Sequence, residues 1–173
     1  MVPRYDIFRT ATDGSVLWLE SAADLEAAKI RVKELAASLP ADYLIQNQST
    51  GQRIAIKPTK GVIFQIGYEP VQLNARTKVL QHLGYEVLSA PDNPAAKLQL
   101  LSPRHVDLFI IGHSAPEPVR REIVDWLKAN YPNVKILALQ PSDAQLSPVP
   151  DADYNVTING SDDWLSLVAT AVG

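Results

Sequence analysis

The sequence contains no cysteine, and this absence excludes several kinds of chemistry together. Disulfide bonds, thiolate nucleophiles and most zinc sites all need that side chain. The chain also lacks any apolar run near the roughly 20 residues that span a bilayer. Its first residues have no basic region followed by an apolar stretch, the pattern of a secretory signal. We therefore expect a cytoplasmic protein that makes no contact with a membrane.

An excess of positive charge is also absent. The formal net charge is −3, and no part of the sequence carries a basic stripe of the kind that binds nucleic acid. Apolar residues make up 46% of the 173 residues and charged residues 20%, which is typical of an ordinary globular protein. A chain of this length can form one large domain or a small domain followed by a medium one.

The first part of the chain has the pattern of two hairpins separated by a helix. Alternating apolar residues predict strands at 5–9, 16–20, 43–46 and 53–57. Ser21, with Asp24 three residues later, is typical of a helix N-cap, and Pro40 would end the helix. Its predicted inward face consists of Leu25, Ala28, Val32, Leu35 and Leu39. The sequence thus predicts a small α+β domain of ββαββ order over residues 1–58.

A short polar segment, Lys57–Gly61, predicts a domain boundary. After it, apolar strands and helices alternate strictly through residues 59–173. The predicted strands are 62–66, 85–89, 108–111, 135–139 and 153–157, and the predicted helices are 71–83, 93–101, 117–130 and 161–172. This alternation favours an α/β fold with a parallel five-stranded sheet covered by helices on both faces.

Helix faces and helix ends follow from the spacing of apolar residues. In the helix at 71–83 we expect Val71, Ala75, Val79, Leu80 and Leu83 to face inward. In the helix at 117–130 we expect Ile123, Trp126 and Leu127 to face inward, and the Arg120–Arg121 pair to be solvated. Gly84 has the position of a glycine that ends a helix.

The central strand of this second domain ends in the loop that should decide its function. Leu108–Ile111 is uninterrupted and apolar, as in a strand buried on both faces. Parallel strands place their chemistry in the loops at their carboxyl ends. Here that loop begins with Gly112, His113 and Ser114, and it contains no carboxylate, thiol or lysine.

Several stretches of residues 62–173 match one family in register. They are Ile66-Gly67-Tyr68-Glu69-Pro70, Leu83-Gly84-Tyr85-Glu86-Val87, Val106–Ile111, Ala115-Pro116 and Ala152-Asp153-Tyr154. Together they resemble the response-regulator receiver (CheY-like) domain. The resemblance implies a flavodoxin-like, doubly wound sheet of strand order 2-1-3-4-5 and a place in phosphorelay signal transduction of the bacterial type. Residues 1–58 resemble no family that we can name.

Carried over position by position, the resemblance implies that every catalytic group is missing. The acidic pair that holds Mg²⁺ falls on Gly67 and Tyr68, and the phosphoacceptor aspartate falls on Gly112. The switch Ser/Thr falls on Gln140 and the family's lysine on Ile158. Phosphoryl transfer to a side chain needs a carboxylate nucleophile and a metal held by oxygen ligands. These positions supply neither, which predicts a degenerate pseudo-receiver.

Two nearby acids do not replace the missing ones. Asp107 precedes its strand, so we expect it at the opposite edge of the sheet, and Glu69 could supply at most one weak ligand. A second departure from the family is the segment Gln140–Asp151, which contains three prolines. Proline costs about 3 kcal/mol inside a helix, so the family's fourth helix should be shortened or lost. The usual receiver dimer face should then be remodelled, and the sequence leaves the oligomeric state open.

The polar residues around the degenerate site admit more than one interpretation. His113 could be a phosphohistidine, a metal ligand or an anion contact, but a histidine that fills loop space is the simpler interpretation. His82 and His105 should lie far from it, so no metal site is expected. Gly67 and Gly112 could leave a cleft for a ligand, or they could let the two loops collapse together; we favour collapse.

The sequence thus favours a non-enzymatic, two-domain signalling or scaffold protein without a cofactor. Its pseudo-receiver would bind a protein partner independently of aspartyl phosphorylation, and the sequence does not identify that partner. The alternative is a sensor of a small ligand or anion in the Gly67/Gly112 cleft, with ligand contacts from Tyr68, Glu69, His113 and Ser114. A third, weaker interpretation is a phosphorylatable response regulator whose acceptor is displaced.

Overall fold

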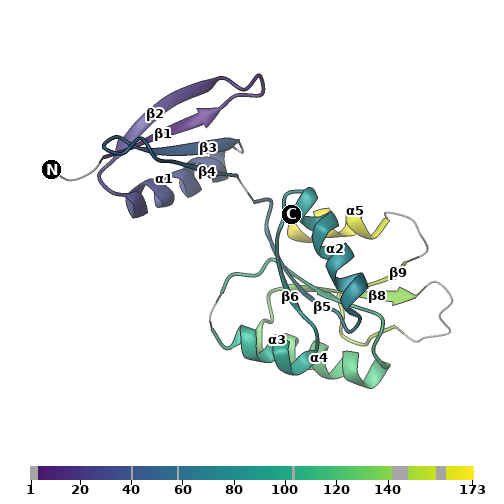
Figure 1. The fold of residues 1–173 in the computed structure, drawn as a ribbon. Helices are drawn as coiled ribbons and strands as arrows, with labels where there is room; N and C mark the ends of the chain where they lie inside the picture. Colours follow the sequence, from purple (N-terminus) through teal and green to yellow (C-terminus); the bar gives the residue numbers. More distant parts are fainter. Residues whose placement is uncertain (1–3, 40, 58, 103, 142–147, 159–162) are drawn as a thin grey trace. The chain divides into compact units, whose positions relative to one another are not determined.

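The computed structural model describes residues 4–39, 41–57, 59–102, 104–141, 148–158 and 163–173. Its contacts divide the chain into two compact units, Met1–Pro58 and Thr59–Gly173, each with its own core (Figure 1). In the segment predicted as a linker, Thr59 and Lys60 belong to the second unit. The Lys60 amide donates to the Gly84 carbonyl (2.9 Å), and the Glu86 amide donates to Thr59 Oγ1 (3.1 Å).

The first unit is a helix on a four-stranded antiparallel sheet, and its ββαββ order is as predicted. The elements are β1 (Tyr5–Thr10), β2 (Val16–Ala22), α1 (Leu25–Ser38), β3 (Asp42–Asn47) and β4 (Arg53–Ile56), and the strand order is β2-β1-β3-β4. Ile7 and Ile45 of the central strands pack against Ala28 and Val32 of α1. Each strand therefore contributes alternate side chains to a single apolar layer beneath one helix.

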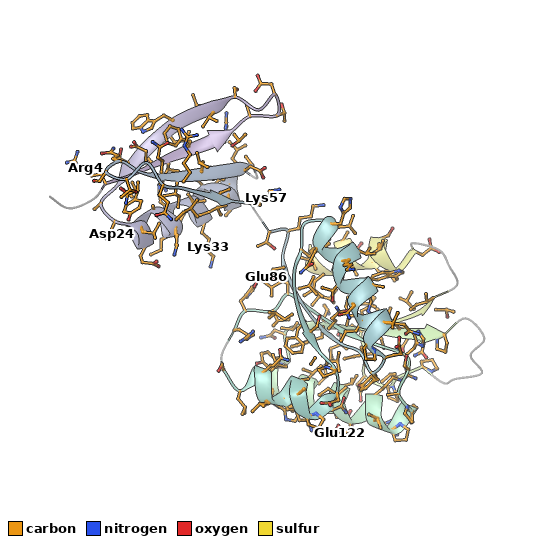
Figure 2. The ribbon with its side chains drawn as sticks, in the orientation of Figure 1. Arg4, Asp24, Lys33, Lys57, Glu86 and Glu122 are labelled. Atoms are coloured by element: carbon orange, nitrogen blue, oxygen red, sulfur yellow. The ribbon has the colours of Figure 1, made fainter. Side chains whose placement is uncertain are left out.

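The start of α1 differs from the prediction. Strand β2 continues through Ser21, whose hydroxyl donates to Asp6 (2.6 Å) instead of capping the helix. Asp24, labelled in Figure 2, is the N-cap, and its carboxylate accepts a hydrogen bond from the Ala27 amide (2.8 Å). Serine and aspartate are both good N-caps. Because Ser21 is paired with Asp6 in the β1–β2 ladder, Asp24 caps the helix. Leu39, predicted to face inward, is 47% exposed because it follows the last helical turn. Pro40 lies outside the described residues.

The second unit is a parallel sheet between two layers of helices. Its strands are β5 (Val62–Ile66), β6 (Glu86–Ala90), β7 (Leu108–Ile111), β8 (Lys135–Pro141) and β9 (Tyr154–Ile158). Its helices are α2 (Pro70–His82), α3 (Asn93–Leu100), α4 (Glu117–Asn130) and α5 (Asp163–Val172). The strand order is β6-β5-β7-β8-β9, which confirms the predicted order 2-1-3-4-5. Helices α2 and α5 cover one face, and α3 and α4 cover the other (Figure 1).

The central strands are buried on both faces, as their uninterrupted apolar sequences predict. Phe64 and Phe109 face α3 and α4, whereas Ile63 and Ile110 face α2 and α5. Gly84, with a φ of 97°, ends α2 in the left-handed conformation that glycine adopts without strain. Trp126 is only partly buried at the edge of the α3–α4 layer.

Helix α2 presents only part of the predicted face: Leu80 is buried and Leu83 packs against the core as predicted, but Ala75 is exposed. Leu73, Arg76 and Leu80 are buried, whereas Val71 is 74% exposed and Val79 42% exposed. The cause is Gln65, a fully buried polar side chain on the face of β5 beneath this helix. A buried amide must be hydrogen-bonded, and the polar side of α2 supplies its partners. Val71 and Val79 therefore turn outward, while Leu73 and Leu80 pack inward beside this network.

The segment between β8 and β9 contains no helix among its described residues, which end at Pro141 and resume at 148. Val149 is buried there and pairs through its main chain with the Asn155 side chain (2.8 and 3.2 Å). The single turn considered for 143–146 lies outside the described residues. Of the helices in the described ranges, none has the length and hydropathy needed to cross a bilayer.

We predict that residues 59–173 fold without the first unit. The physical reason is that each unit has a separate apolar core and that the domain boundary falls between Pro58 and Thr59. A fragment beginning at Thr59 should unfold in one cooperative thermal transition, measured by circular dichroism. A fragment that is unfolded or aggregates under conditions where the full chain is folded would contradict this.

Candidate functional site

The five positions that the resemblance assigns to a receiver's catalytic groups lie at one edge of the parallel sheet. Gly67 and Gly112 directly follow β5 and β7, and the Gly112 amide donates to the Ile66 carbonyl (2.8 Å). Gln140 lies near the end of β8 and Ile158 ends β9. None of these residues has a carboxylate.

Gln140 and Ile158 make contacts typical of a folded core. Gln140 is 5% exposed, and its amide nitrogen donates to Asn155 Oδ1 (3.0 Å). Ile158 packs against the cluster of apolar residues beneath α2 and α5. Both side chains thus serve packing or hydrogen bonding within the sheet edge.

The space beside the two glycines is filled by α2. A Cβ atom at Gly67 would lie 2.7 Å from Leu73 Cδ1 and 3.1 Å from Arg76 Nη2. A Cβ atom at Gly112 would lie 3.3 Å from the same Arg76 nitrogen and 3.3 Å from the Gly67 Cα. The glycines therefore allow close approach of both loops and of an arginine, which corresponds to the collapsed arrangement considered from the sequence.

Arg76 is held in this place by a buried polar network. Its Nε donates to Gln65 Oε1 (2.9 Å). The Gln65 amide nitrogen donates to the Leu73 carbonyl (3.2 Å), Thr77 Oγ1 (2.5 Å) and Ser89 Oγ (2.9 Å). The network satisfies the glutamine and fixes the direction of the arginine side chain.

Among the described residues, the guanidinium of Arg76 has no acidic partner. The side chain is 8% exposed, and in the described part of the chain neither its hydrogen bonds nor its ion pairs include a carboxylate. Burial lowers the pKa of Arg76 to about 10, so the group remains a cation at neutral pH. A positive charge thus stands beside the positions where a receiver needs negative ones.

A second arginine is buried on the opposite face of the sheet. Arg120 of α4, predicted to be solvated, is fully buried, and its Nη1 donates to the carbonyl of Leu139 (3.2 Å) and to Gln140 Oε1 (3.5 Å). Desolvation lowers its pKa. Its neighbour Arg121 is solvated as predicted, with an ion pair to Glu117 (2.6 Å).

Tyr68, one of the predicted ligand contacts, is engaged with α3. Its hydroxyl donates to Asn93 Oδ1 (2.8 Å), and burial raises its pKa. Asn93 in turn donates to the Val119 carbonyl (2.8 Å) and to Glu122 (2.5 Å), which is labelled on α4 in Figure 2. This network joins α3 to α4 and places the tyrosine on the side of the sheet away from α2.

The other three predicted contacts lie around the start of α2. The Glu69 carboxylate caps this helix by accepting from the amides of Val71 (3.2 Å) and Gln72 (2.8 Å). Ser114 donates to the Gln72 side chain (3.1 Å). His113 lines a cavity together with Arg76. The structure therefore brings His113 and Ser114 near one opening and separates Tyr68 from them.

Asp107 lies at the opposite edge, as predicted, where its Oδ2 accepts from the amide of Val62 at the start of β5 (2.8 Å). It also pairs with His105 (2.6 Å), so this histidine is far along the strand from His113. No group of three His, Cys, Asp or Glu side chains with metal-binding geometry occurs among the described residues.

Sequence reasoning missed Arg76 and Arg120. Helical spacing offered a signal for the first, because Leu73, Arg76 and Leu80 recur at three and four residues and form one face. The more apolar alternative with Val71 and Val79 competed with it. Only the burial of Gln65 on the sheet decides between these two faces.

No family model matches the sequence, and no curated protein matches it. Several solved structures do match this chain. The response regulator TrrA from Thermotoga maritima, solved with Mg²⁺ and BeF, matches with a TM-score of 0.56 and 20% identity, over 65% of this chain and 99% of that one. A receiver domain from Clostridium thermocellum matches with a TM-score of 0.56 and 17% identity, over 65% and 93%.

A chain from the complex of the histidine kinase ThkA with TrrA matches with a TM-score of 0.55 and 22% identity, over 65% of this chain and 97% of that one. The share of this chain that is covered agrees with the extent of the second unit, Thr59–Gly173. Identities at this level show the fold alone. The second unit has the fold of a receiver domain.

We predict that Arg76→Met leaves the protein as stable as the wild type or makes it more stable. The substitution removes a buried charge that has no carboxylate partner among the described residues, which costs several kcal/mol, and it leaves the buried Gln65 oxygen without its donor, which costs about 1–3 kcal/mol. Urea denaturation should show an unfolding free energy higher by about 1–2 kcal/mol. Arg121→Met, at a solvated ion pair, is the matched control and should change it by less than about 1 kcal/mol. A loss of more than about 1 kcal/mol in Arg76→Met would contradict the assignment of an uncompensated charge.

Proposed function

We propose that this protein is a signalling or scaffold protein whose receiver-like unit binds a protein partner and accepts no phosphoryl group. One observation carries the proposal: the Arg76 guanidinium lies beside Gly67 and Gly112, the positions that the resemblance assigns to the metal-binding acid and the phosphoacceptor. A buried cation there repels a divalent metal ion. It would also compete for any carboxylate introduced nearby.

The remaining acid near the site supports the same proposal. Glu69 uses its carboxylate to cap α2, and this role stabilises the helix that carries Arg76. Moving Glu69 to a metal would remove that cap, a loss of about 1 kcal/mol. The displaced-acceptor interpretation therefore has no evident metal ligand in the described residues to support it.

The fold and the outer surface of its helices support a protein partner. TrrA, which shares the fold, was crystallised with the histidine kinase ThkA. In this chain α2 exposes Val71 and Val79, and α3 exposes Leu98 (70%) with Leu101 (73%) directly after it. Exposed apolar side chains on helix surfaces are suited to contact another protein.

A second candidate function, the sensing of a small ligand or anion, is favoured by one observation. A cavity lined by Arg76 and His113 lies on the side of α2 and α5, and neither glycine is among its described lining residues. The two functions are compatible, since a ligand bound there would contact the helix that carries the exposed valines.

We predict that acetyl phosphate with Mg²⁺ leaves the protein unmodified, and that Gly112→Asp is unmodified as well. An aspartate at 112 would meet Arg76 at ion-pair distance, so it should be held by the guanidinium instead of by a metal. The measurement is intact mass after treatment with the phosphodonor. TrrA, treated in parallel, is the positive control for the reagent.

The same variant has a second readout. Because the new carboxylate gives Arg76 its missing partner, Gly112→Asp should unfold at a higher temperature than Gly112→Asn, which has the same shape without the charge. A gain of one phosphoryl group on the unmodified sequence would overturn the proposal, and mapping it would reveal the true acceptor.

We also expect one partner to be captured from native lysate whether or not the phosphodonor and Mg²⁺ are present. Phosphorylation-independent binding requires equal recovery in both conditions. A partner recovered only after treatment with the phosphodonor would show that the unit works as a phosphorylation-dependent receiver.

A further inference from the structure

A cavity of about 380 Å³ lies in the second unit, between α2 and the end of the sheet. Its walls are mainly apolar. Ala75 and Val79 of α2 form one wall, and Ile158 and Trp164, at the end of β9 and the start of α5, form another. Its size falls within the range of about 300–1,000 Å³ that is typical of small-molecule sites.

The apolar wall on α2 results from the helix rotation described above. Val79, predicted to face the core, is 42% exposed because the buried glutamine of β5 draws Arg76 inward. The rotation therefore has two effects at one place. It leaves apolar side chains exposed at the cavity wall, and it places the charged Arg76 side chain in the cavity lining.

The polar groups of the cavity are few. They include Arg76, Gln72 and His113. The Gln72 side-chain oxygen accepts from Ser114, and in the described part of the chain its amide nitrogen has no hydrogen-bond partner. A ligand oxygen could accept hydrogen bonds from both the arginine and this amide.

Arg76 itself lacks the partner that such a ligand would supply. Arg76 is 8% exposed, and within the described ranges only its Nε is hydrogen-bonded. Among the described residues neither terminal nitrogen has a hydrogen-bond partner. By contrast Arg31, on the surface of the first unit, pairs with two glutamates (2.5 and 2.9 Å). Buried charges in proteins are usually paired, and here the pair is incomplete.

We propose that this cavity binds a small organic monocarboxylate with an apolar or aromatic body. The two carboxylate oxygens would accept hydrogen bonds from the terminal nitrogens of Arg76, in the bidentate geometry that guanidinium and carboxylate share. The body of the ligand would lie between Val79 on one side and Ile158 and Trp164 on the other.

The chemistry of the lining selects this class of anion. One guanidinium neutralises one negative charge, whereas inorganic phosphate carries more than one near neutral pH and would leave charge against apolar walls. A neutral compound of the same shape would fill the cavity but would leave Arg76 without a counterion. The site thus requires the charge and the apolar body together.

The two glycines make this arrangement possible. A side chain at Gly67 or Gly112 would come within 3.1 or 3.3 Å of Arg76 Nη2, before its own further atoms are counted. In place of acids that would pair with the arginine, the chain has residues without side chains. The guanidinium therefore remains available to an external carboxylate.

The test is a calorimetric titration of the full chain with benzoate, 3-phenylpropionate and indole-3-acetate, each compared with its neutral amide and with inorganic phosphate. We expect at least one carboxylate to bind with a dissociation constant of millimolar or lower. Its amide should bind at least about 10-fold more weakly, because a hydrogen bond to a charged group contributes about that factor or more.

Two variants locate the site. Arg76→Met should weaken carboxylate binding at least about 10-fold. Ala75→Trp, at an exposed helix position, should fill the cavity and abolish binding while circular dichroism shows an intact fold. Arg121→Met, on the solvated face of α4, is the matched control and should bind as the wild type does.

Binding of no carboxylate at 10 mM would overturn the proposal, as would equal binding of acid and amide or tighter binding of inorganic phosphate. Equal binding by Ala75→Trp would also overturn it. This inference does not depend on the absence of phosphoryl transfer. Phosphorylation of the wild type would refute the proposed function and leave the ligand titration unchanged.

Discussion

The burial of Gln65 beneath α2 is the constraint on which the rest of the candidate site depends. A primary amide on the face of a parallel sheet must find hydrogen-bond partners inside the protein. Thr77, Ser89 and the Leu73 carbonyl receive its donors, and Arg76 donates to its oxygen. These bonds fix the rotation of α2 about its axis. The rotation then determines which side chains reach the ends of β5 and β7.

With the site positions carried over from receivers as we propose, the electrostatics of this sheet edge are the reverse of those in a phosphoacceptor site. A phosphoacceptor site gathers carboxylates at the carboxyl edge of the sheet and neutralises them with a metal ion. In this chain a guanidinium occupies that neighbourhood, and glycines replace the side chains that would clash or pair with it. We propose that a site built in this way favours anions. Its cost in stability, an unpaired buried charge, is of the kind that proteins tolerate at functional positions.

Much of the fold follows from the sequence because strong local signals agree with one another. The run Leu108–Ile111 is apolar throughout because it is covered on both faces, and Gly84 ends α2 as its position indicates. The orientation of α2 does not follow, because two faces of that helix have comparable apolar content. Whether Val79 or Arg76 faces the sheet depends on Gln65, a residue of strand β5. The burial of Arg120 likewise depends on carbonyl and amide groups at the end of β8.

The candidate site was predictable only as a set of positions. The ends of the strands bring Gly67 and Gly112 together in any parallel sheet of this order, and the loss of acids is visible in the residues themselves. The group that lies beside these positions is the guanidinium of Arg76. It belongs to helix α2, and no local sequence pattern assigns it to the site. The most direct test is therefore the environment of Arg76, measured by NMR on ¹⁵N-labelled full-length protein. The Arg76 Nε–H signal should exchange slowly with solvent and show contacts to the Gln65 side chain, whereas a rapidly exchanging signal without these contacts would place the guanidinium in solvent.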